Sequence, residues 1–398
     1  MATGLGLDVE ESWEKALRGE TAIGRISGEV KSPVQAVGEV RAEDFWRLRE
    51  VFPAEAMGER RTLFALWSAQ KAIEDSGLSG GGSGFGVSMA AGLAVNRLQD
   101  VAGWVKDGNT FDYKRFAAEI AQVHPESIMR NNSHHAASLI AQKHSFGGPN
   151  CTITTACASA TQAIGVAFRM IRRGDADVMA AGGADSMINP VGLVFFVLLG
   201  AACTAKEGLA EACRPFDRKR SGLVMGEGAG MVILEDESHA RKRGARIYAE
   251  VAGYGSSLDA YQVTAPPPNG AGAVDAMRRA LADSRLNPAD VSYVNAHGTS
   301  TKLNDLAETV ALKTVFGEHA YRLCVSSSKA LIGHLLAASG GPELIFTTLS
   351  VARDVVHPTI NLKNPDPKCD LDYVPNVMRE ITVRAALSNS FGFGGQNA

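Results

Sequence analysis

The sequence lacks any long hydrophobic run. Its longest apolar stretch, Pro190 to Cys203, has 14 residues, fewer than the roughly 20 that an α-helix needs to cross a bilayer. The first residues, Met1 to Leu17, carry charges where a signal peptide would have its apolar core. We therefore expect neither a membrane span nor a secretion signal. The stretch Pro190 to Cys203 is expected to be buried, to line a pocket for a lipid chain, or to contact another subunit.

The sequence also has no excess of charge of one sign. Its 40 Lys and Arg residues face 43 Asp and Glu residues, which gives a formal net charge of -3. A general nucleic-acid binder is therefore not expected, because such proteins attract phosphates with a strongly basic surface. The 398 residues, 45% of them hydrophobic and 21% charged, are typical of a globular protein with two core-sized halves.

Cysteines are few and scattered. The six cysteines show no CxxC spacing, so the sequence predicts neither a zinc site nor a disulfide framework. A reduced cytoplasmic setting is the default for such a chain. The neighbouring His134 and His135 point to opposite sides of a strand and to different sides of a helix, so no metal site is expected there.

A glycine-rich run, Ser79 to Gly92, resembles a nucleotide-binding loop at first sight. It lacks the GK[ST] ending of such loops, and no acidic partner for a ribose follows it. The run is therefore predicted to be a turn that leads into a buried strand, with Leu93 near the end of that strand.

The most informative stretch surrounds Cys157. The β-branched run Cys151 to Thr155 predicts a buried strand, and apolar residues at i, i+4 and i+7 from Ile164 predict a helix that ends before Gly174. Cys157 stands at the junction among small residues, as a tight strand-to-helix elbow requires. A thiol at a helix N-terminus is expected to favour the nucleophilic thiolate. The alternative is a cysteine that acts only as a small buried apolar residue.

A similar order recurs in the second half of the chain. The stretch Cys324 to Val356 again predicts a strand, an elbow of small residues and a long helix that begins near Ile332. Such repetition predicts two similar α/β units packed together, covering residues 1–245 and 246–398.

Hydrophobic periodicity predicts further elements. They are a helix capped by Asp8, helices over residues 60–76 and 304–316, a helix bearing Val274, Met277 and Leu281, and strands over residues 177–183, 248–255 and 291–301.

Two histidines complete the candidate site. His297 directly follows a predicted apolar strand, and His334 follows the second elbow. The two elbow helices are expected to lie near a pseudo-twofold axis, so that Cys157 and the segment Lys329 to His334 converge on one cleft. A cysteine with histidines performs acyl transfer, in which histidine moves a proton or donates to an oxyanion. Cys–His–Asn hydrolases use the same groups, so these residues leave two classes open.

Longer motifs carry a resemblance to a known family. The sequence resembles the β-ketoacyl-acyl-carrier-protein synthases, and most of all the elongating type II enzymes. The motifs are TACAS around Cys157, GGAD at 182–185, RPFD at 214–217, GEGAG at 226–230, VNAHGTST ending at Thr301, SSSKALIGHLLAASG from Ser326, and NSFGFGGQN ending at Asn397. The resemblance implies a thiolase-like five-layer α-β-α-β-α fold with two pseudo-repeated halves.

The same resemblance implies catalytic roles. Cys157 would accept the growing acyl chain as a thioester. His297 and His334 would bind the thioester carbonyl of a malonyl donor and stabilise the enolate left by decarboxylation. The N–H groups of Cys157 and Phe393 would form an oxyanion hole. Phe393 would also act as a gate, because the glycines beside it permit motion.

Further residues are implied around this centre. Lys329 and Glu343 would set the charge near His334, or form a purely structural ion pair. Substrate-binding roles are expected for a wider set: Thr299 and Thr301 at the pantetheine arm, Phe196 and Leu93 in the acyl pocket, and Thr264 in the loop before Pro266.

The implied reaction is a decarboxylative Claisen condensation that elongates a fatty acid on acyl carrier protein. No cofactor is implied beyond the phosphopantetheine arm of the carrier, and a homodimer is usual, with a heterodimer of related subunits as the alternative. The same reaction in polyketide or polyene synthesis stays open. A non-catalytic chain-length subunit would lack Cys157. A thiolase would replace one histidine by cysteine and carry a further cysteine near its C-terminus, whereas no cysteine follows Cys369.

Carrier proteins are acidic, so the resemblance also implies basic side chains near the mouth of the pocket. Arg60, Arg61 and Lys206 are the first candidates, and Lys302 is the next. Gly200 stands where many relatives carry an arginine that meets the carrier. The alternative for Arg60 and Arg61 is a solvated helix face.

Overall fold

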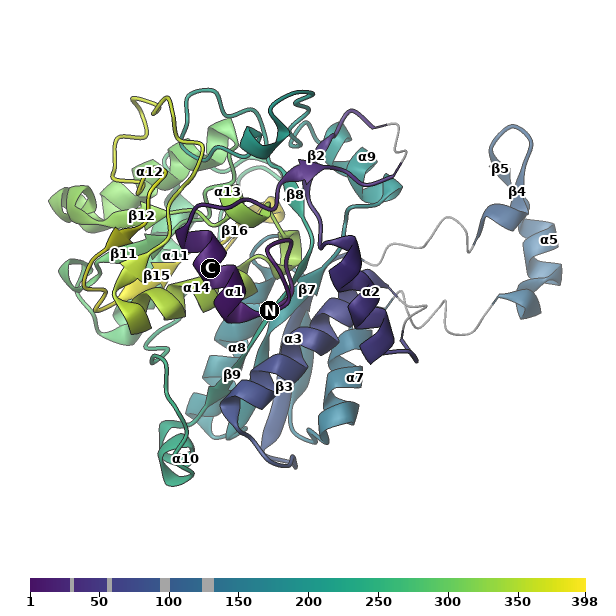
Figure 1. Cartoon of the computed structure of the whole chain (residues 1–398), viewed down its shortest axis with the longest axis horizontal. Helices are drawn as coiled ribbons and strands as arrows, with labels where there is room; N and C mark the ends of the chain where they lie inside the picture. The colour runs from purple at the N-terminus through teal and green to yellow at the C-terminus, as the bar shows by residue number, and fades with distance from the viewer. Residues whose placement is uncertain (29–31, 56–58, 94–100, 124–131) are drawn as a thin grey trace.

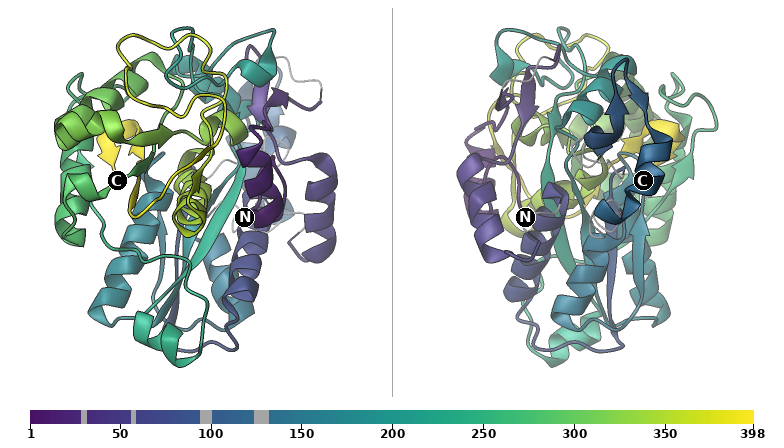
Figure 2. Two further views of the ribbon diagram at one scale, coloured as in Figure 1. Left: turned by 60° about the vertical axis from the view of Figure 1, so that its left-hand side comes forward. Right: turned by 90° about the vertical axis from the view of Figure 1, so that its right-hand side faces the viewer.

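The computed structural model describes the whole chain except residues 29–31, 56–58, 94–100 and 124–131 (Figure 1). Two sheets lie in different halves of the molecule, with helices on their outer faces and between them. Figure 2 shows the same arrangement from two further sides.

The first sheet has four strands in the order β6 (Asn150–Ile153), β3 (Phe85–Ala91), β7 (Val178–Asp185) and β9 (Gly228–Glu235). Strand β3 pairs in parallel with both β6 and β7, while β9 runs antiparallel to β7. The glycine-rich run therefore leads into a buried strand, as the sequence predicts.

The side chains of this sheet alternate between two helical layers. Val87 and Met89 of β3 pack in one cluster with α3 (Arg60–Ser76) and α7 (His135–His144). Ala90 points to the other face and packs against α8 (Ser159–Arg173). A strand that packs against helices on both faces is a nearly continuous run of apolar residues. The sequence of β3 therefore shows no alternation of apolar and polar residues.

The second sheet repeats this plan with three parallel strands. Strand β11 (Tyr293–Asn295) lies between β12 (Cys324–Ser326) and β15 (Ala386–Ser388). One cluster joins this sheet to α11 (Ala271–Ser284) and α12 (Lys302–Phe316). The inner face meets α14, Gly340–Arg353. The predicted α-β-α-β-α order is confirmed.

Helices α8 and α14 form the central layer. A side chain at Gly340 would place its Cβ 2.2 Å from Oγ1 of Thr161, so only glycine permits this approach. The Thr161 hydroxyl also lies 2.7 Å from the Ser390 hydroxyl. The two elbow helices therefore meet closely.

The N-terminal segment belongs to the core of the second half. Asp8 caps α1 (Val9–Leu17) by accepting the N–H of Glu11 at 3.0 Å, as predicted. Trp13 packs against Phe346 of α14, with ring centroids 5.8 Å apart.

Three predictions of secondary structure are wrong in whole or in part. The strand predicted over residues 291–301 is limited to β11, Tyr293–Asn295. Residues 248–255 form no strand. The segment packs on α11, where a Cβ at Gly255 would lie 2.1 Å from the Ala276 oxygen. The long helix begins at Gly340 rather than near Ile332, and Lys329–Ile332 is a separate single turn, α13. The N–H of His334 instead donates to the Val224 oxygen at 2.7 Å, which draws the chain out of the helix.

Shorter elements complete the fold. They are α2 (Ala42–Val51), α5 (Tyr113–Ala118), α9 (Pro190–Leu198), α10 (Glu237–Lys242), β1 (Gly24–Arg25), β2 (Ala36–Gly38), β4 (Val105–Lys106), β5 (Thr110–Phe111), β8 (Met225–Gly226), β10 (Ser257–Leu258), β13 (Val355–Val356), β14 (Arg379–Glu380), β16 (Phe391–Gly392) and β17 (Gln396–Asn397).

The long apolar stretch of the sequence contains α9. Leu193 and Phe196 on this helix are buried, whereas Val194 and Leu198 are exposed. The stretch is thus buried on one side only. Within the described ranges, no helix has the length and apolar content that a membrane crossing requires.

Candidate active site

Cys157 lies in a tight elbow between β6 and α8. Ala156 adopts a left-handed conformation, with φ of 50°, which reverses the chain ahead of the helix. The backbone at Gly392 approaches so closely that a Cβ there would lie 3.0 Å from the nitrogen of Cys157. These contacts explain the small residues around the cysteine and fix its position.

Three side chains from separate parts of the sequence converge at this elbow. The Sγ atom of Cys157 lies 3.1 Å from Nε2 of His334. The sulfur and one ring nitrogen each of His297 and His334 all lie within 4.8 Å of one another. All three side chains are buried. The predicted convergence of the two halves on one centre is therefore present in the structure.

The hydrogen bonds of His334 determine which nitrogen carries its proton. The backbone N–H of Leu336 donates to Nδ1 at 3.2 Å, so Nδ1 acts as an acceptor. Burial, and then the charge of Lys329, lower the pKa of His334 well below its usual value. The ring is therefore neutral with its proton on Nε2, and Nε2–H points toward Cys157.

His297 is held through its backbone. Its N–H donates to one oxygen of Glu308 at 2.9 Å, and the N–H of Gly298 donates to the other at 2.8 Å. Asn389 donates to the same carboxylate at 3.2 Å. The ring of His297 lies edge-on to that of His334, with centroids 5.3 Å apart.

The His297 ring is neutral as well. Burial lowers its pKa well below the usual value, and the positive charge of Lys329 acts in the same direction. Its Nδ1 atom is buried and has no hydrogen-bond partner. A neutral imidazole with an unsatisfied nitrogen is suited to exchange a hydrogen bond with a bound substrate.

The sequence analysis did not identify Glu308 as a residue of the site. The signal was present, because Asp305 and Glu308 are acids on the buried face of the predicted helix over residues 304–316. Burial raises the pKa of Glu308 to about 7. An acid buried at such a cost commonly holds a functional element, as this one holds the turn after β11.

Lys329 and Glu343 form a buried ion pair between α13 and α14. The ammonium group of Lys329 contributes to the low pKa of both histidines. It also acts to lower the pKa of the Cys157 thiol. The pair thus joins two helices and also affects the charge around the histidines. Both roles considered from the sequence, a structural ion pair and a group that sets the charge near His334, are compatible with this geometry.

The sequence predicted a thiolate at Cys157, and this prediction is wrong for the site without substrate. Burial raises the pKa of Cys157 to about 12 and outweighs the opposing effects of Lys329 and the backbone N–H of Phe393. The Phe393 N–H and the Nε2–H of His334 nevertheless aim donors at the sulfur position. The thiol is therefore neutral at rest, and its proton must leave as the sulfur attacks.

Apolar side chains lie beside this centre. Phe196 of α9 and Phe393 pack with ring centroids 6.4 Å apart, in a cluster with Met187, Leu193 and Leu336. Gly394, next to Phe393, has φ of 79°, which only glycine adopts easily. The two residues predicted for the acyl pocket and the gate are therefore neighbours.

The remaining substrate-binding candidates divide into two groups. The hydroxyl groups of Thr299 and Thr301 lie 2.9 Å apart in the loop after His297. Leu93 and Thr264 are exposed, and the oxygen of Val263, next to Thr264, accepts the N–H of Gly394 at 2.6 Å. Leu93 offers its carbonyl oxygen to Arg61 at 3.2 Å.

The predicted docking cations are mostly engaged elsewhere. Arg61 is wrong as a docking residue, because its side chain is buried, pairs with Glu59 and donates to the Gly92 oxygen at 2.8 Å. Arg60 is partly exposed, but its guanidinium binds the buried carboxylate of Glu227. Lys206 is exposed.

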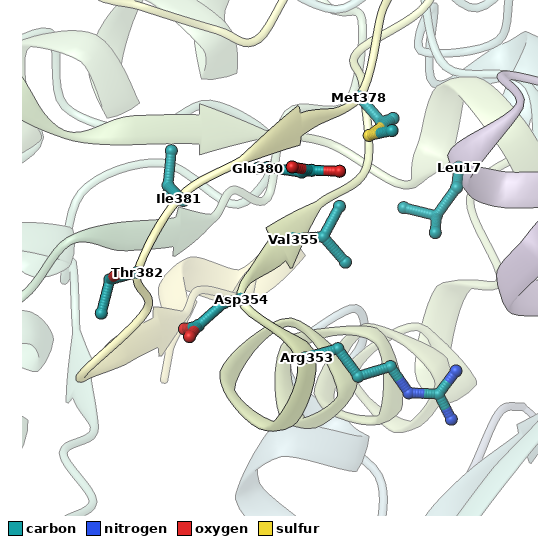
Figure 3. A pocket seen from close by; sticks show the side chains of 8 residues that line it. All are labelled: Leu17, Arg353, Asp354, Val355, Met378, Glu380, Ile381 and Thr382. Atoms are coloured by element: carbon teal, nitrogen blue, oxygen red, sulfur yellow. The ribbon is translucent and has the colours of Figure 1, made fainter.

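A surface pocket of about 520 Å³ lies away from the cluster (Figure 3). It is bounded by side chains that include Leu17, Asp354, Val355, Met378 and Glu380, and contains no cysteine or histidine. The Cys–His centre is therefore the site with the chemistry for a covalent reaction.

The arrangement is suited to acyl transfer. A cysteine supplies the nucleophile, a neutral histidine contacts it, and a second neutral histidine lies beside the first. A backbone N–H aimed at the sulfur position can bind an oxyanion formed there.

Both halves of the chain match family models. Residues 1–240 match the model described as "Beta-ketoacyl synthase, N-terminal domain". Residues 248–363 match the model described as "Beta-ketoacyl synthase, C-terminal domain".

Curated relatives and solved structures agree. The chain is 40% identical to 3-oxoacyl-[acyl-carrier-protein] synthase 2 of Synechocystis sp., over 99% of this chain and 94% of the relative. The Staphylococcus aureus (strain COL) protein of the same name is 39% identical, with the same coverage. A type II polyketide ketosynthase, solved with its acyl-carrier protein and a hexaketide, matches at TM-score 0.88 and 33% identity, covering 100% of this chain and 95% of that one. A β-ketoacyl synthase from Burkholderia phymatum matches at TM-score 0.83 and 30% identity, with the same coverage.

Proposed function

This chain belongs to the β-ketoacyl synthase family, and from this premise we propose that it elongates fatty acids by condensing an acyl group with malonyl-acyl carrier protein. The products are a β-ketoacyl-acyl carrier protein, carbon dioxide and free carrier. The observation that carries the proposal is the convergence of Cys157, His297 and His334 within 4.8 Å.

The first step loads the enzyme. The sulfur of Cys157 attacks the thioester carbonyl of the acyl carrier and loses its proton, and the carrier thiol takes up a proton as it leaves. The N–H groups of Cys157 and Phe393 would stabilise the tetrahedral oxyanion, and burial strengthens such hydrogen bonds. The N–H of Phe393 already donates toward the sulfur of Cys157.

The second step generates the carbon nucleophile. The neutral rings of His297 and His334 would bind the malonyl thioester oxygen while carbon dioxide leaves and its bonding electrons form the enolate. The Nε2–H of His334 is the donor favoured by the bond that Leu336 makes to Nδ1. Each such donor contributes roughly 3–4 kcal/mol in a water-excluded site.

The third step forms the carbon–carbon bond. The enolate carbon attacks the carbonyl of acyl-Cys157 and the C–S bond breaks, so that the sulfur leaves as a thiolate and takes up a proton from solvent to regenerate the thiol. Thr299 and Thr301 would hold the pantetheine arm during this step, and Phe196 with Phe393 would border the acyl chain. Lys329 and Glu343 would keep both histidines neutral.

We also propose a cytoplasmic homodimer as the working assembly. Apolar side chains are exposed on the segment that carries β4, β5 and α5, which stands away from the sheets in Figure 1. Tyr113 is 76% exposed and Ile120 is 58% exposed, as expected for surfaces that a second subunit covers. Sedimentation of the purified protein tests this.

The proposed reaction is tested by incubating the purified protein with malonyl-carrier and acyl-carriers of several chain lengths, and identifying products by mass spectrometry. Products two carbons longer are expected with wild type and none with Cys157→Ala. Cys151→Ala is a matched control, because Cys151 lies in the preceding strand, where its thiol donates to the Ser88 hydroxyl at 3.2 Å. The polyketide alternative is suggested by the similarity to the 33%-identical ketosynthase. It would be favoured if the wild-type protein extended unreduced polyketide intermediates in preference to fatty acyl groups.

A further inference from the structure

Ser339 stands directly before α14, in the position where a serine usually caps a helix. The hydroxyl oxygen of such a serine typically accepts the N–H of the second or third helical residue. Within the described part of the chain, the Ser339 hydroxyl forms no capping bond with α14. It lies instead 2.7 Å from Nδ1 of His334. The hydroxyl of this buried serine is therefore directed at a histidine of the active site.

The direction of this hydrogen bond follows from a second contact of the same ring. The backbone N–H of Leu336 donates to Nδ1 of His334 at 3.2 Å, so Nδ1 carries no proton. An unprotonated Nδ1 can only accept, whereas a serine hydroxyl can donate. Ser339 is therefore the donor, and Nδ1 of His334 accepts two hydrogen bonds.

The backbone between the two residues is shaped for this arrangement. Leu336 has φ of 52°, a left-handed conformation that a leucine rarely adopts, and its N–H is turned back toward the ring. The next N–H along the chain, that of Ala337, donates to the buried carboxylate of Asp185 on β7 at 3.0 Å. The loop that follows His334 is thus fixed at successive residues.

The position of Ser339 is set by a different part of the molecule. The residue after it, Gly340, lies so close to α8 that a Cβ would be 2.2 Å from Oγ1 of Thr161. Helix α8 begins at Ser159, shortly after Cys157. Because α14 starts against the helix that follows the nucleophile, Ser339 fixes the ring of His334 relative to Cys157.

A donor at Nδ1 affects the opposite nitrogen of the ring. It keeps the proton on Nε2, and it withdraws electron density from the ring, so that Nε2–H becomes a stronger donor. Nε2 is the atom that lies 3.1 Å from Sγ of Cys157. The proposed decarboxylation requires this atom to donate to the malonyl thioester oxygen.

We propose that Ser339 is a positioning residue of the condensation, whose hydroxyl holds His334 in the tautomer that donates from Nε2. This inference rests on the proposed function, because it assigns Ser339 a part in the decarboxylation step. Ser339 acts through His334 rather than on the substrate. Both side chains are buried, so water does not compete for the bond between them.

The first test is spectroscopic and requires no substrate. In the full-length protein labelled with 15N-histidine, the ring nitrogens of His334 are identified by the NMR signals that His334→Ala removes. In wild type, Nδ1 should resonate as an unprotonated nitrogen and Nε2 as a protonated one. In Ser339→Ala, the Nδ1 signal should move downfield, because this nitrogen then accepts fewer hydrogen bonds. A protonated Nδ1 in wild type, or an unchanged signal in Ser339→Ala, would overturn the proposal.

The second test measures the release of labelled carbon dioxide from malonyl-carrier. Ser339→Ala should lower kcat about five- to tenfold, the effect of one lost hydrogen bond, and leave KM nearly unchanged. Ser339→Thr retains a hydroxyl and should restore most of the rate and the Nδ1 signal. A loss of rate in Ser339→Thr as large as that in Ser339→Ala would assign the effect to packing and overturn the proposal.

Ser350→Ala is the matched control. Ser350 is another buried serine of α14, about three turns further along the helix, and its hydroxyl donates to the Phe346 oxygen at 3.0 Å. This variant should change neither the Nδ1 signal of His334 nor the rate. An equal loss of rate in Ser350→Ala would attribute the effect to a loosened helix and would also overturn the proposal. Absence of condensation by wild type would refute the proposed function itself, whereas the NMR signals would still show whether Ser339 holds the ring.

Discussion

At the scale of single residues, the main property of the site is that its cysteine and its two histidines carry no charge. Burial keeps the thiol of Cys157 protonated and both histidines uncharged, while the charge of Lys329 acts to lower the pKa of all three groups. A neutral site can bind an uncharged thioester without first displacing a tightly held ion. Charge then develops only during reaction, where fixed donors are most effective.

The protonated thiol predicts a distinctive pH profile. Because the pKa of Cys157 is raised to about 12, its thiolate fraction increases with pH throughout the range in which the protein is folded. The rate of alkylation by iodoacetamide should rise roughly tenfold per pH unit from pH 6 to 9, as expected for a thiol well below its pKa. Mass spectrometry of the modified peptide measures the rate at each pH.

Removing the buried ion pair should slow this alkylation. Lys329 lowers the pKa of the thiol more than Glu343 raises it, so Lys329→Met combined with Glu343→Gln leaves the thiol still less acidic. For the preceding pH profile, an alkylation rate of wild type that stops rising below pH 8 would contradict a protonated Cys157 at rest.

Loss of either histidine should separate the two half-reactions. His297→Ala and His334→Ala should still acquire an acyl group on Cys157, but malonyl decarboxylation should fall by about 10²–10³-fold, since each removes one donor to the enolate oxygen. Release of labelled carbon dioxide measures the step. His144→Ala is the control, because His144 ends α7 on the outer layer. Normal carbon dioxide release from both site variants would show that their role lies elsewhere.

At the scale of elements, local signals predicted the regular helices well. The helix over residues 60–76 has the predicted bounds, and α8 ends at Gly174 in a left-handed cap. These elements agree with the sequence because their periodicity and end signals are local.

Elements governed by distant contacts were not predictable in this way. The break between α13 and α14 arises where His334 pairs its N–H with Val224, a contact with residues about a hundred positions away. The burial of Arg61 likewise depends on carbonyl groups at the end of β3. Cys157, His297 and His334 could be named from motifs, but their supporting contacts appear only in the structure. Glu308 accepts the backbone N–H of His297 at 2.9 Å, and the hydroxyl of Ser339 lies 2.7 Å from Nδ1 of His334.

The close approach of α8 and α14 predicts a sensitive glycine. Gly340→Ala would force a Cβ against Thr161 and so separate the two central helices. Overpacking of this kind costs about 1–3 kcal/mol of unfolding free energy. Urea denaturation measures the change, with Gly24→Ala as control because a Cβ there meets nothing within 4 Å. Equal stability of the two variants would show that the helices can separate freely.

At the scale of the whole molecule, the two halves share their cores. Trp13 and Leu5 from the start of the chain pack with Leu331, Ile345 and Phe346 from the second half. Another cluster joins Val37 to Phe196 and Leu336. Residues on the two sides of the proposed division between 1–245 and 246–398 therefore bury one another.

Separate halves should therefore fail to fold alone. Expressed by itself, the fragment 1–245 should be insoluble or lack cooperative unfolding, because Met1, Trp13 and Ala16 would lose their apolar partners. Co-expression with 246–398 should restore a soluble complex, which circular dichroism and calorimetry can detect. A fragment 1–245 that unfolds cooperatively on its own would show that the shared clusters contribute little.

The protonated state of Cys157 also bears on oxidative damage. Peroxide oxidises the thiolate form of cysteine to sulfenic and then to irreversible acids, so a buried protonated thiol is a slow target. Before an acyl group binds, the burial that keeps the Cys157 thiol protonated also protects this thiol from oxidation. Once loaded, the sulfur is a thioester and has no thiolate to lose. In the proposed cycle, Cys157 therefore rests either as a protonated thiol or as a thioester, and both forms react slowly with oxidants.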